Sequence, residues 1–335
     1  MAVSIKDIAR VANVSYSTVS RALNDNPRVQ AQTKARIQRI ASEMGYLPSA
    51  VGRSLVTRRT RTIGIVVSTI TDLFYAEVID AIEETGFNHG YAVFLANSGG
   101  VPQRELAAIR ALRERWVDGL IVVSCCSSKE ELCAERVIDI PVVVINNAHR
   151  DHIGYSIEVD NVAGGQAATR HLLQLGHRRI SHIVGPTTEW DAVERHSGYK
   201  QAMQAYGLTV DPALIVRGNS RPKGGIEAMK RLLALPAPPT AVFCYNDATA
   251  LGAVRAARDA GLRIPQDLSV VGFDDIDLAS YLEPPLTTVA QPRRAMGERA
   301  VEMILALLAG GPSVADCMLP GKLVVRGSTA ALGQS

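Results

Sequence analysis

Two short helical patterns separated by a tight turn occupy residues 4–23, and they constrain the fold more than any other feature. The first has an apolar stripe with the spacing i, i+3, i+4 and i+7, made by Ile5, Ile8, Ala9 and Ala12. Ser4 precedes this stripe as a capping residue, with Asp7 three residues further on. Asn13-Val14 supplies the turn, and Ser15 caps a second helix whose inner face carries Val19, Ala22 and Leu23. The segment therefore predicts a helix-turn-helix.

The outer face of the second predicted helix carries small polar side chains, one aromatic ring and one arginine. In a helix-turn-helix, side chains near the start of the second helix read base edges in the major groove of DNA. An ordinary helical hairpin with a solvated polar face is the alternative interpretation. We expect DNA contacts from six residues of this helix and its flanks, namely Ser15, Tyr16, Ser17, Ser20, Arg21 and Asn24.

Basic residues are concentrated at the N-terminal end of the chain. Residues 1–61 hold eleven Lys and Arg against three acidic residues, a net charge of +8, whereas the whole chain carries +3. The remaining residues, 62–335, therefore carry −5. A basic head on a mildly acidic body is typical of a protein that binds nucleic-acid phosphates, and it argues against the plain hairpin. We expect Arg10, Lys34 and Arg36 to add phosphate affinity rather than base recognition.

A third helix completes the predicted head. Its helical spacing is kept by Thr33, Ile37, Ile40, Ala41 and Met44. Gly45 is placed to end this helix, and residues 46–48 are extended because the residue before a proline avoids the α conformation. Residues 49–57 have too few apolar side chains to fold alone. We expect a short helix there only when a partner is bound.

Several short motifs follow the head in a fixed order. They include Tyr46-x-Pro48, Arg53-Ser54-Leu55 and the Thr60–Gly64 entry into the first apolar run. Others lie along the body, at Gly176–Ile180, Asn246-Asp247, Ala250–Ala253, Ile264–Asp275, Pro285–Val289 and Met296-Gly297. With the head, they resemble the LacI/GalR family of bacterial transcriptional regulators over essentially the whole chain. The chain departs from that family at Ser49, where Asn is usual, and at Gly327, where Glu is frequent.

The resemblance implies a repressor that binds a pseudo-palindromic operator in double-stranded DNA as a homodimer and responds to a small-molecule effector. Residues 1–48 would be the DNA-binding domain, 49–61 the hinge helix and linker, and 62–335 the effector-binding and dimerisation domain. Two hinge helices would pair at the operator centre and wedge Leu55 into the minor groove, which kinks the duplex. Opening or closing of the body would favour or oppose that pairing.

The body alternates between short apolar runs and amphipathic helical segments. The runs are Ile63–Val67, Tyr91–Leu95, Gly119–Val123, Val142–Ile145, Ile180–Val184, Ala241–Cys244 and Leu268–Gly272. The helical segments include Tyr75–Asn88, Pro102–Arg115, Val162–Leu175, Gly224–Leu235 and Ala248–Gly261. Uninterrupted apolar runs indicate strands covered on both faces, as in parallel α/β sheets. A pause at residues 157–161 divides the alternation into two similar halves.

The predicted fold class is an all-α helix-turn-helix head followed by an α/β body of two doubly wound parallel-sheet subdomains. The resemblance implies that this body is of the periplasmic-binding-protein type. It also implies three chain crossings, near residues 160, 290 and 320. One subdomain would then combine residues 62–160 with 291–320, and the other residues 161–290 with 321–335.

Open α/β sheets bind ligands beyond the carboxyl ends of their strands. The residues expected to bind the effector follow predicted strands and combine aromatics, amides, acids and one arginine: Asp72, Phe74, Tyr75, Asn146, Trp190, Arg195, Asn246 and Asp274. The resemblance implies that the guanidinium of Arg195 grips the ligand.

Several of these residues have a structural alternative. In these alternatives, Asn246 or Asp247 would cap the following helix, with Asp247 favoured as the cap. Phe74 or Trp190 would pack into the core, and Arg195 would form a surface ion pair with Glu194 or Asp191. Asp274 or Asp275 would stabilise the turn after its strand.

A sugar or sugar derivative is the first expected effector, because Arg195 donates and Asp274 accepts, as adjacent hydroxyl groups require. An aromatic face from Phe74 or Trp190 would cover the apolar side of the sugar ring. A nucleobase is the alternative, since it fits the aromatic rings but gives Arg195 and Asp274 less to bind. A solute-binding module for transport is the alternative of a different class, and the basic head argues against it.

The sequence lacks the motifs of membrane proteins, secreted proteins, nucleotide-dependent enzymes and metal-binding proteins. No apolar run reaches 18 residues and no secretory signal opens the chain, so a cytoplasmic protein without membrane contact is expected. The sequence has neither a glycine-rich phosphate loop nor a cluster of Cys and His with metal-ligand spacing, so we expect no enzyme, metal or cofactor. The five cysteines are expected to be buried or half-buried thiols, with a redox or metal sensor at Cys125, Cys126 and Cys133 as the alternative.

Overall fold

The computed structural model describes residues 3–24, 26–46, 59–134, 139–147, 153–187, 189–311 and 314–333. The chain divides into two compact units, residues 1–62 and residues 63–335, which are described separately. Within the described residues, no helix combines the length and apolar character needed to cross a membrane.

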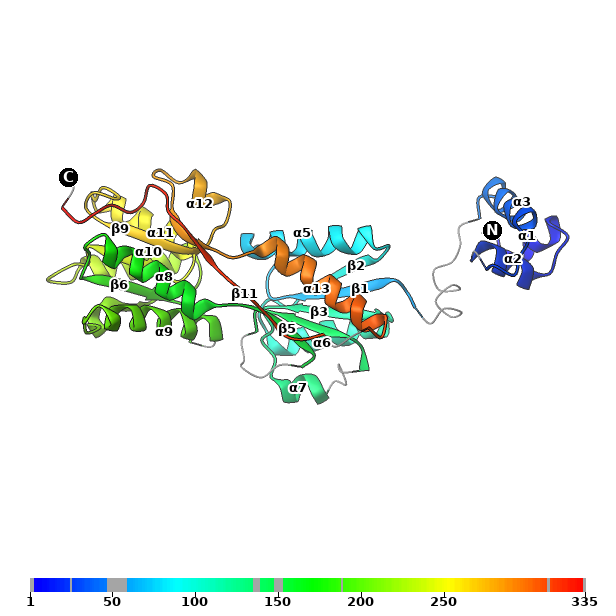
Figure 1. Cartoon of the computed structure of the whole chain (residues 1–335), viewed down its shortest axis with the longest axis horizontal. Helices are drawn as coiled ribbons and strands as arrows, with labels where there is room; N and C mark the ends of the chain where they lie inside the picture. The colour runs from blue at the N-terminus through cyan, green and yellow to red at the C-terminus, as the bar shows by residue number, and fades with distance from the viewer. Residues whose placement is uncertain are drawn as a thin grey trace. The chain divides into compact units, whose positions relative to one another are not determined.

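The head consists of three helices, α1 (Ile5–Val11), α2 (Tyr16–Leu23) and α3 (Ala31–Glu43), as Figure 1 shows. Its core is built on Ile8, Val19 and Ile37, one fully buried side chain from each helix. The predicted caps are confirmed: the Asp7 carboxylate accepts the Ser4 backbone N–H at 3.0 Å, and the Ser15 hydroxyl accepts the Thr18 N–H at 3.2 Å. α3 ends before Gly45, whose φ of +65° suits glycine.

The first sheet of the body has six strands in the order β11-β5-β4-β3-β1-β2. Their bounds are β1 (Thr62–Val67), β2 (Ala92–Asn97), β3 (Gly119–Val123), β4 (Val142–Ile145), β5 (Tyr155–Val159) and β11 (Cys317–Leu319). The helices are α5 (Leu73–Asn88), α6 (Pro102–Glu114), α7 (Lys129–Ala134) and α13 (Arg293–Leu308). Neighbouring residues of β1 point to opposite faces, because Ile65 packs in the core with α5 and α13 whereas Val66 packs with α6 and α7. Both faces are therefore covered, as the sequence predicted.

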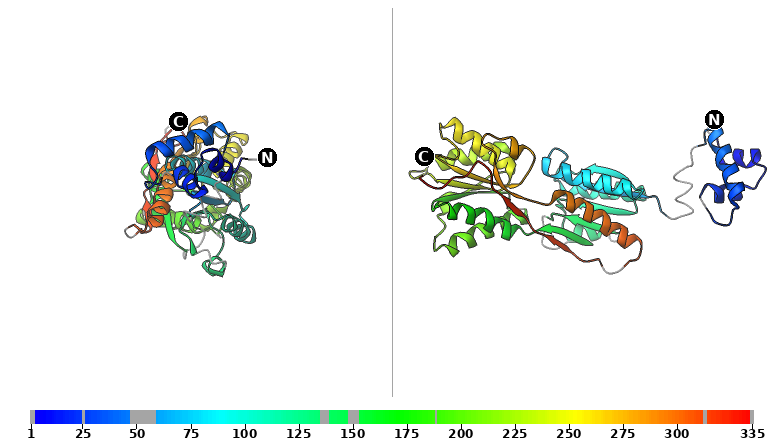
Figure 2. Two further views of the ribbon diagram at one scale, coloured as in Figure 1. Left: turned by 90° about the vertical axis from the view of Figure 1, so that its right-hand side faces the viewer. Right: turned by 45° about the horizontal axis from the view of Figure 1, so that its top comes forward.

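The second sheet has the order β12-β10-β9-β8-β6-β7. Its strands are β6 (Ile180–Val184), β7 (Ile215–Arg217), β8 (Ala241–Cys244), β9 (Ser269–Asp274), β10 (Thr287–Ala290) and β12 (Lys322–Val324). The helices are α8 (Asn161–Gln174), α9 (Trp190–Ala205), α10 (Pro222–Leu233), α11 (Asp247–Asp259) and the short α12 (Leu278–Tyr281), with a 3₁₀ turn at Pro212–Leu214. Figures 1 and 2 show α8 with α9 on one face of this sheet and α10 with α11 on the other. β12 runs antiparallel to β10 at the edge.

The chain passes between the two sheets three times. It leaves the first sheet after β5 and enters α8, leaves the second after β10 for α13, and returns between β11 and β12. The chain divides into two halves at residues 157–161, as predicted, because it crosses there from the first sheet to the second. This stretch is nevertheless not a pause in secondary structure, since it is the second half of β5 and the start of α8. The polar Ser156 and Glu158 interrupt this strand, so a search for continuous apolar runs does not find it.

Other elements also differ from the sequence-based set. β2 is an edge strand on which Phe94 and Leu95 are 46% and 44% exposed, so that run is not covered on both faces. The strands β7, β11 and β12 have three residues each and do not stand out as apolar runs. α9 lacks a clean apolar stripe because the charged Arg195 is buried beside Tyr199 on its inner face.

Candidate functional sites: the DNA-binding head and the effector cavity

The outer face of α2 is open to solvent. Tyr16 is 64% exposed and Arg21 is exposed, whereas Val19 and Ala22 are buried on the opposite face. Ser17 and Ser20 lie half-buried between these two faces. The predicted base-reading side chains therefore share one accessible helix face, which suits insertion into the major groove.

Several polar side chains of the head are bonded to the protein itself. Ser15 caps α2, and the Asn24 side-chain amide donates to the Ser20 carbonyl at 2.9 Å. Arg36 donates to the Ala12 carbonyl at 2.8 Å, and Arg10 pairs with Asp7 at 3.2 Å. These contacts orient the side chains, and for Arg36 they tie α3 to the end of α1. Leu55 and the rest of the predicted hinge at residues 49–57 lie outside the described residues.

In the body, a cavity lies at the carboxyl ends of strands from both sheets. Its lining residues come from the start of α5, from the ends of β3 and β4, and from the segment after β6: Tyr75, Ser124, Asn146, Asn147, Glu189 and Asp191. Asn146 has a φ of +51°, which turns the chain sharply after β4. Its side-chain oxygen is buried and has no hydrogen-bond partner among the described residues. The cavity thus has a polar wall rich in acceptor oxygens.

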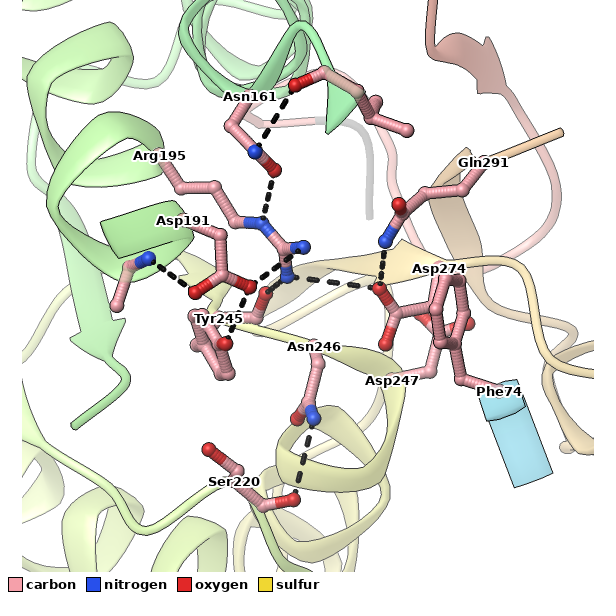
Figure 3. Close-up of polar contacts among 12 residues, drawn as sticks. Phe74, Asn161, Asp191, Arg195, Ser220, Tyr245, Asn246, Asp247, Asp274 and Gln291 are labelled. Carbon is pink, nitrogen blue, oxygen red and sulfur yellow. Dashed lines mark hydrogen bonds and ion pairs between the residues drawn. The ribbon is translucent and has the colours of Figure 1, made fainter. Parts of the chain in front are cut away.

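Arg195 lies behind this wall, on the inner face of α9, and is 3% exposed. Its guanidinium donates to Asn161 Oδ1 at 2.9 Å and to the Tyr245 carbonyl at 2.8 Å, as Figure 3 shows. It pairs with Asp191 at 3.2 Å and with Asp274 at 3.6 Å. Burial alone lowers the pKa of Arg195, but these neighbouring groups raise it above the ordinary value. Arg195 is therefore a charged, buried centre of the site.

Close helix packing places that guanidinium. Gly165 in α8 lies against the Arg195 backbone, and Gly198 in α9 lies against the Val162 carbonyl, so that a Cβ at either glycine would clash with backbone. The guanidinium carbon also lies 3.8 Å from the ring centre of Phe273 and 4.7 Å from that of Tyr245. Arg195 is therefore enclosed by two aromatic rings and two acids.

The Tyr245 hydroxyl joins two carboxyl groups of the cavity wall. It lies 2.7 Å from Glu189 Oε2 and 2.7 Å from Asp191 Oδ2. Burial raises the pKa of Glu189 to about 7, and the nearby Asp191 adds to this rise. Because a hydroxyl carries one hydrogen, a proton on Glu189 allows both contacts to be hydrogen bonds.

A third acidic residue, Glu158, lies near this wall. Glu158 on β5 accepts the Asn147 backbone N–H at 3.2 Å, and burial raises the pKa of Glu158 to about 8. Repulsion from Glu194, Asp191 and Asp316 adds to that rise. The body therefore holds two carboxyl groups next to the cavity, Glu158 and Glu189, that keep their protons to a higher pH than ordinary acids.

Asp274 at the end of β9 is buried on the other side of Arg195. It accepts from the Gln291 side-chain amide at 2.7 Å, and its φ is +111°. Burial raises the pKa of Asp274 well above its usual range, against the opposing effect of Arg195. Arg195 and Asp274, which we expected to bind the effector, pair with each other and with the surrounding protein. Arg195 also forms the alternative ion pair with Asp191, but this pair is not on the surface, because Arg195 is 3% exposed.

Asn246, and not Asp247, caps α11, which corrects the sequence-based choice. Asn246 Oδ1 accepts the Thr249 N–H at 2.9 Å, and its side-chain amide donates to the Ser220 carbonyl at 3.2 Å. Asp247 is fully buried and accepts from the Ile276 backbone and the Thr288 hydroxyl. Asp247 points inward because β10 and the segment after β9 supply hydrogen-bond donors to it. These donors are distant in the sequence, so the residues around Asp247 do not reveal them.

The remaining predicted residues lie at the cavity margin or in the core. Asp72 caps α5 by accepting the Phe74 N–H at 3.0 Å. Phe74 is buried in the core, in edge contact with Tyr75. Trp190 is 36% exposed at the start of α9, and its indole N–H donates to Glu194 at 3.0 Å. Of the eight predicted effector residues, Tyr75 and Asn146 line the cavity.

Ser124, Asn147, Glu189 and Asp191 also line the cavity and are not among the eight residues expected to bind the effector. Ser124, Asn147 and Asp191 follow strands, so the rule of carboxyl ends identifies them as candidates. Glu189 has no sequence signal, because an acid in a loop before a helix is typical of any surface turn.

The cysteine cluster beside the cavity has a structural explanation. Glu105 on α6 is fully buried and accepts from the thiols of Cys125 and Cys126 and from the backbone N–H groups of Cys126 and Ser127. Burial and Glu105 raise the pKa of both thiols, to about 12 for Cys126. Cys133 is exposed, contrary to the expectation of buried or half-buried thiols. No group of metal-ligating side chains occurs within the described residues.

Comparison with known proteins assigns the two units to known domains. Residues 4–49 match the model of bacterial regulatory proteins of the lacI family, and residues 169–329 match that of a periplasmic-binding-protein-like domain. The HTH-type transcriptional repressor PurR of Vibrio atlanticus (strain LGP32) is 40% identical over 90% of this chain and 91% of its own length. The repressor CytR of Escherichia coli (strain K12) is 38% identical over 99% of this chain and 97% of its own length.

This chain belongs to the LacI family of bacterial transcriptional regulators. It is a DNA-binding transcriptional repressor of that family and not an enzyme. A crystal structure of the lac repressor dimer bound to operator and an anti-inducer matches it with a TM-score of 0.90 and 28% identity, over 99% of this chain and 100% of the other. The complex of the regulator CelR with cellobiose matches with a TM-score of 0.72 and 30% identity, over 97% and 99%. The predicted fold class and family are confirmed.

Proposed function

We propose that this repressor binds a pseudo-palindromic operator as a homodimer in the cytoplasm and is controlled by an effector that enters the cavity of the body. Residues 1–48 serve as the DNA-binding domain, 49–61 as the hinge and 62–335 as the effector-binding and dimerisation domain. The proposal rests on the presence in one chain of an exposed polar face on α2 and a polar cavity between the two sheets of the body. The first feature suits DNA binding, and the second suits binding of a small molecule.

Homodimer formation is supported by the solved neighbour, which is a dimer on its operator. The body also exposes apolar side chains near the edge of its first sheet, since Phe87 is 72% exposed and β2 ends the sheet with Phe94 and Leu95 open to solvent. Such side chains are typical of a surface that a partner covers. Sedimentation of the purified chain at micromolar concentration tests this, and a monomer under all conditions contradicts it.

A sugar is one candidate effector class. The neighbours of this fold include a complex with cellobiose and a regulator from Enterococcus faecium with bound ribose. Tyr75, Ser124, Asn146 and Asn147 supply the amide and hydroxyl groups that bind a polyol.

A nucleobase or nucleoside is the second class, and one observation favours it. Arg195 and Asp274 were expected to bind sugar hydroxyls, but they are bonded to each other and to Asn161, Tyr245 and Gln291. The argument that preferred a sugar therefore loses its main support, and both classes belong in the test.

The decisive experiment measures DNA and ligand binding on the same protein. Operator DNA is first selected from a randomised pool, and its affinity is then measured by fluorescence anisotropy with and without each member of a panel of sugars and nucleosides. The proposal expects one class to raise the melting temperature of the chain and to change operator affinity at least tenfold. Sequence-independent DNA binding that no panel member alters would overturn it.

A further inference from the structure

One hydroxyl group on the cavity wall lies between two carboxyl groups. The Tyr245 hydroxyl oxygen is 2.7 Å from Glu189 Oε2 and 2.7 Å from Asp191 Oδ2. A phenol has one hydrogen to donate, so both contacts are hydrogen bonds only if one carboxyl group brings a hydrogen of its own. The arrangement therefore holds one proton more than two ionised acids would.

The contacts of Asp191 place that proton on Glu189. Asp191 accepts the Ala192 backbone N–H at 2.8 Å and pairs with the Arg195 guanidinium at 3.2 Å, which suits an ionised carboxylate (Figure 3). Glu189 directly precedes α9 but does not cap it, since its carboxyl is directed at Tyr245. The hydrogen-bond chain therefore runs from Glu189 to the Tyr245 hydroxyl and from there to Asp191.

The ring that carries the hydroxyl is held in place. Tyr245 is 5% exposed, and the Arg195 guanidinium carbon lies 4.7 Å from its ring centre. Gly185 lies against the same ring, so closely that a Cβ there would be 2.7 Å from a ring carbon. Asp191 is held by its bonds to Arg195 and Ala192. Glu189 is half-buried in the segment before α9, so it is the member of the three that can move.

The charged groups around Glu189 make this movement depend on its protonation. Burial raises the pKa of Glu189 to about 7, and the carboxyl groups of Asp191 on α9 and Asp72 before α5 add to the rise. Arg195 opposes it, but this guanidinium is shared with Asp191 and Asp274. An ionised Glu189 would thus face two acids without a cation of its own.

We propose that Glu189 is a proton-operated latch on the cavity wall. With its proton, Glu189 donates to Tyr245 and the latch is closed. When the proton leaves to water, Tyr245 donates to one carboxylate only, and the Glu189 carboxylate turns away from Asp191 toward solvent. Because Glu189 and Asp191 line the cavity, the shape of the wall changes with pH near neutrality. The latch belongs to the body alone, and its effect on an effector rests on the proposed function.

Trp190 directly follows Glu189, so its fluorescence reports on this part of the wall. The test uses the full chain with Trp116→Phe, which leaves Trp190 as its single tryptophan. Between pH 5 and pH 9 we expect a transition with a midpoint at about 7. Glu189→Gln should reduce its amplitude about fivefold, because the amide donates to Tyr245 at every pH. A transition of equal amplitude in Glu189→Gln, or none in the parent chain, overturns the proposal.

Two further variants test the latch if Glu189→Gln does not fold. Asp191→Asn removes the neighbouring acid and should lower the midpoint by about half a pH unit or more. Tyr245→Phe keeps the ring but removes the hydroxyl, so Glu189 titrates without a latch and the amplitude should fall by about half or more. An unchanged midpoint in folded Asp191→Asn, or a full amplitude in folded Tyr245→Phe, contradicts the latch.

The control Glu227→Gln changes an exposed acid on α10 and should leave both midpoint and amplitude unchanged. The titration uses neither DNA nor effector, so its result is independent of operator selection. If the transition is absent while the chain binds selected operator DNA, the latch fails and the proposed function stands. If the transition is present but the chain shows no sequence-specific DNA affinity, the proposed function fails and the latch stands.

Discussion

The helix α2 and the cavity of the body both present polar groups to a proposed partner, but they hold these groups in opposite ways. In α2, Tyr16 and Arg21 extend into solvent from a helix whose buried face is a simple apolar stripe. Behind the cavity wall, Arg195 and Asp274 are buried and Asp191 is half-buried, and both carboxyl groups pair with the guanidinium. A solvated side chain adapts to a base edge at little cost in the free protein. A buried charge must be paired at all times, so ligand binding there means exchanging partners.

This difference predicts its largest effect at Arg195. Arg195→Ala leaves the buried Asp274 and the half-buried Asp191 without their cation, and loss of one partner of a buried pair typically costs about 3–5 kcal/mol of unfolding free energy. Both tryptophans, Trp116 and Trp190, belong to the body, so fluorescence during urea unfolding follows that unit. The control is Arg255→Ala, which removes an exposed pair with Asp259 and should cost about 0.2–1 kcal/mol.

The same variant tests the site itself. We expect Arg195→Ala to lose the effector response while the folded head still binds operator. If Arg195→Ala loses no more unfolding free energy than the Arg255→Ala control, the buried ion pairs contribute little to stability. The proposed difference between α2 and the cavity region would then be wrong.

In the head, substitution should change specificity and leave stability nearly unchanged. Arg21→Ala removes an exposed side chain from the outer face of α2, and we expect a loss of about 1–3 kcal/mol at one base position of the operator. Selection from randomised DNA measures the base preference directly. Arg10→Ala, which removes a phosphate-binding candidate, should weaken binding to all sequences alike. An unchanged preference in Arg21→Ala counts against its role in base recognition.

Acids in the body should respond to pH. The pKa of Glu158 is raised from 4.5 to about 8, so the folded chain holds a proton that the unfolded chain releases. The stability from this protonated carboxyl is complete below pH 4.5 and is lost as the pH rises through 8. The free energy of unfolding of Glu158→Gln, relative to that of the natural chain, should therefore increase between pH 5 and pH 9. We expect an increase of more than about 1.4 kcal/mol, the equivalent of one pKa unit.

Thermal melting at several pH values measures this gain as a difference between the two proteins. Using the difference removes the opposite contribution of buried histidines, since burial lowers the pKa of His182 to about 3. Glu83→Gln, at an exposed position of α5, should show no growth with pH. A constant difference between Glu158→Gln and the natural chain would refute the buried-acid explanation.

The smallest expected effect concerns the cap of α2. Ser15→Ala removes the acceptor for the Thr18 N–H and should destabilise the head by about 1 kcal/mol. Amide exchange in α2 is the appropriate measurement, with Ser42→Ala on the exposed face of α3 as the control. Faster exchange confined to Ser15→Ala is expected, and equal exchange in both variants would remove Ser15 from the cap.

Much of the head and the scaffold of the body was predictable from sequence. Caps, apolar stripes and the exposed face of α2 depend on residues within a few positions of one another, and local spacing records them. The strands β1, β3, β4 and β8 were predicted because burial on both faces favours a nearly continuous apolar run. β5 escaped because Glu158 is paired to a distant backbone amide and so is tolerated inside a strand.

The sequence by itself therefore determined the two-part organisation, the helix-turn-helix and the edge of the sheets at which ligands bind. Only the tertiary structure decided how the polar groups at that edge are used. Arg195 meets Asp274 across 79 positions of chain, and the pKa of Glu189 is raised by burial and by the nearby Asp191. Pairing and desolvation depend on which groups the fold brings together in a low-dielectric interior. Short stretches of sequence do not show which distant groups meet or become buried together.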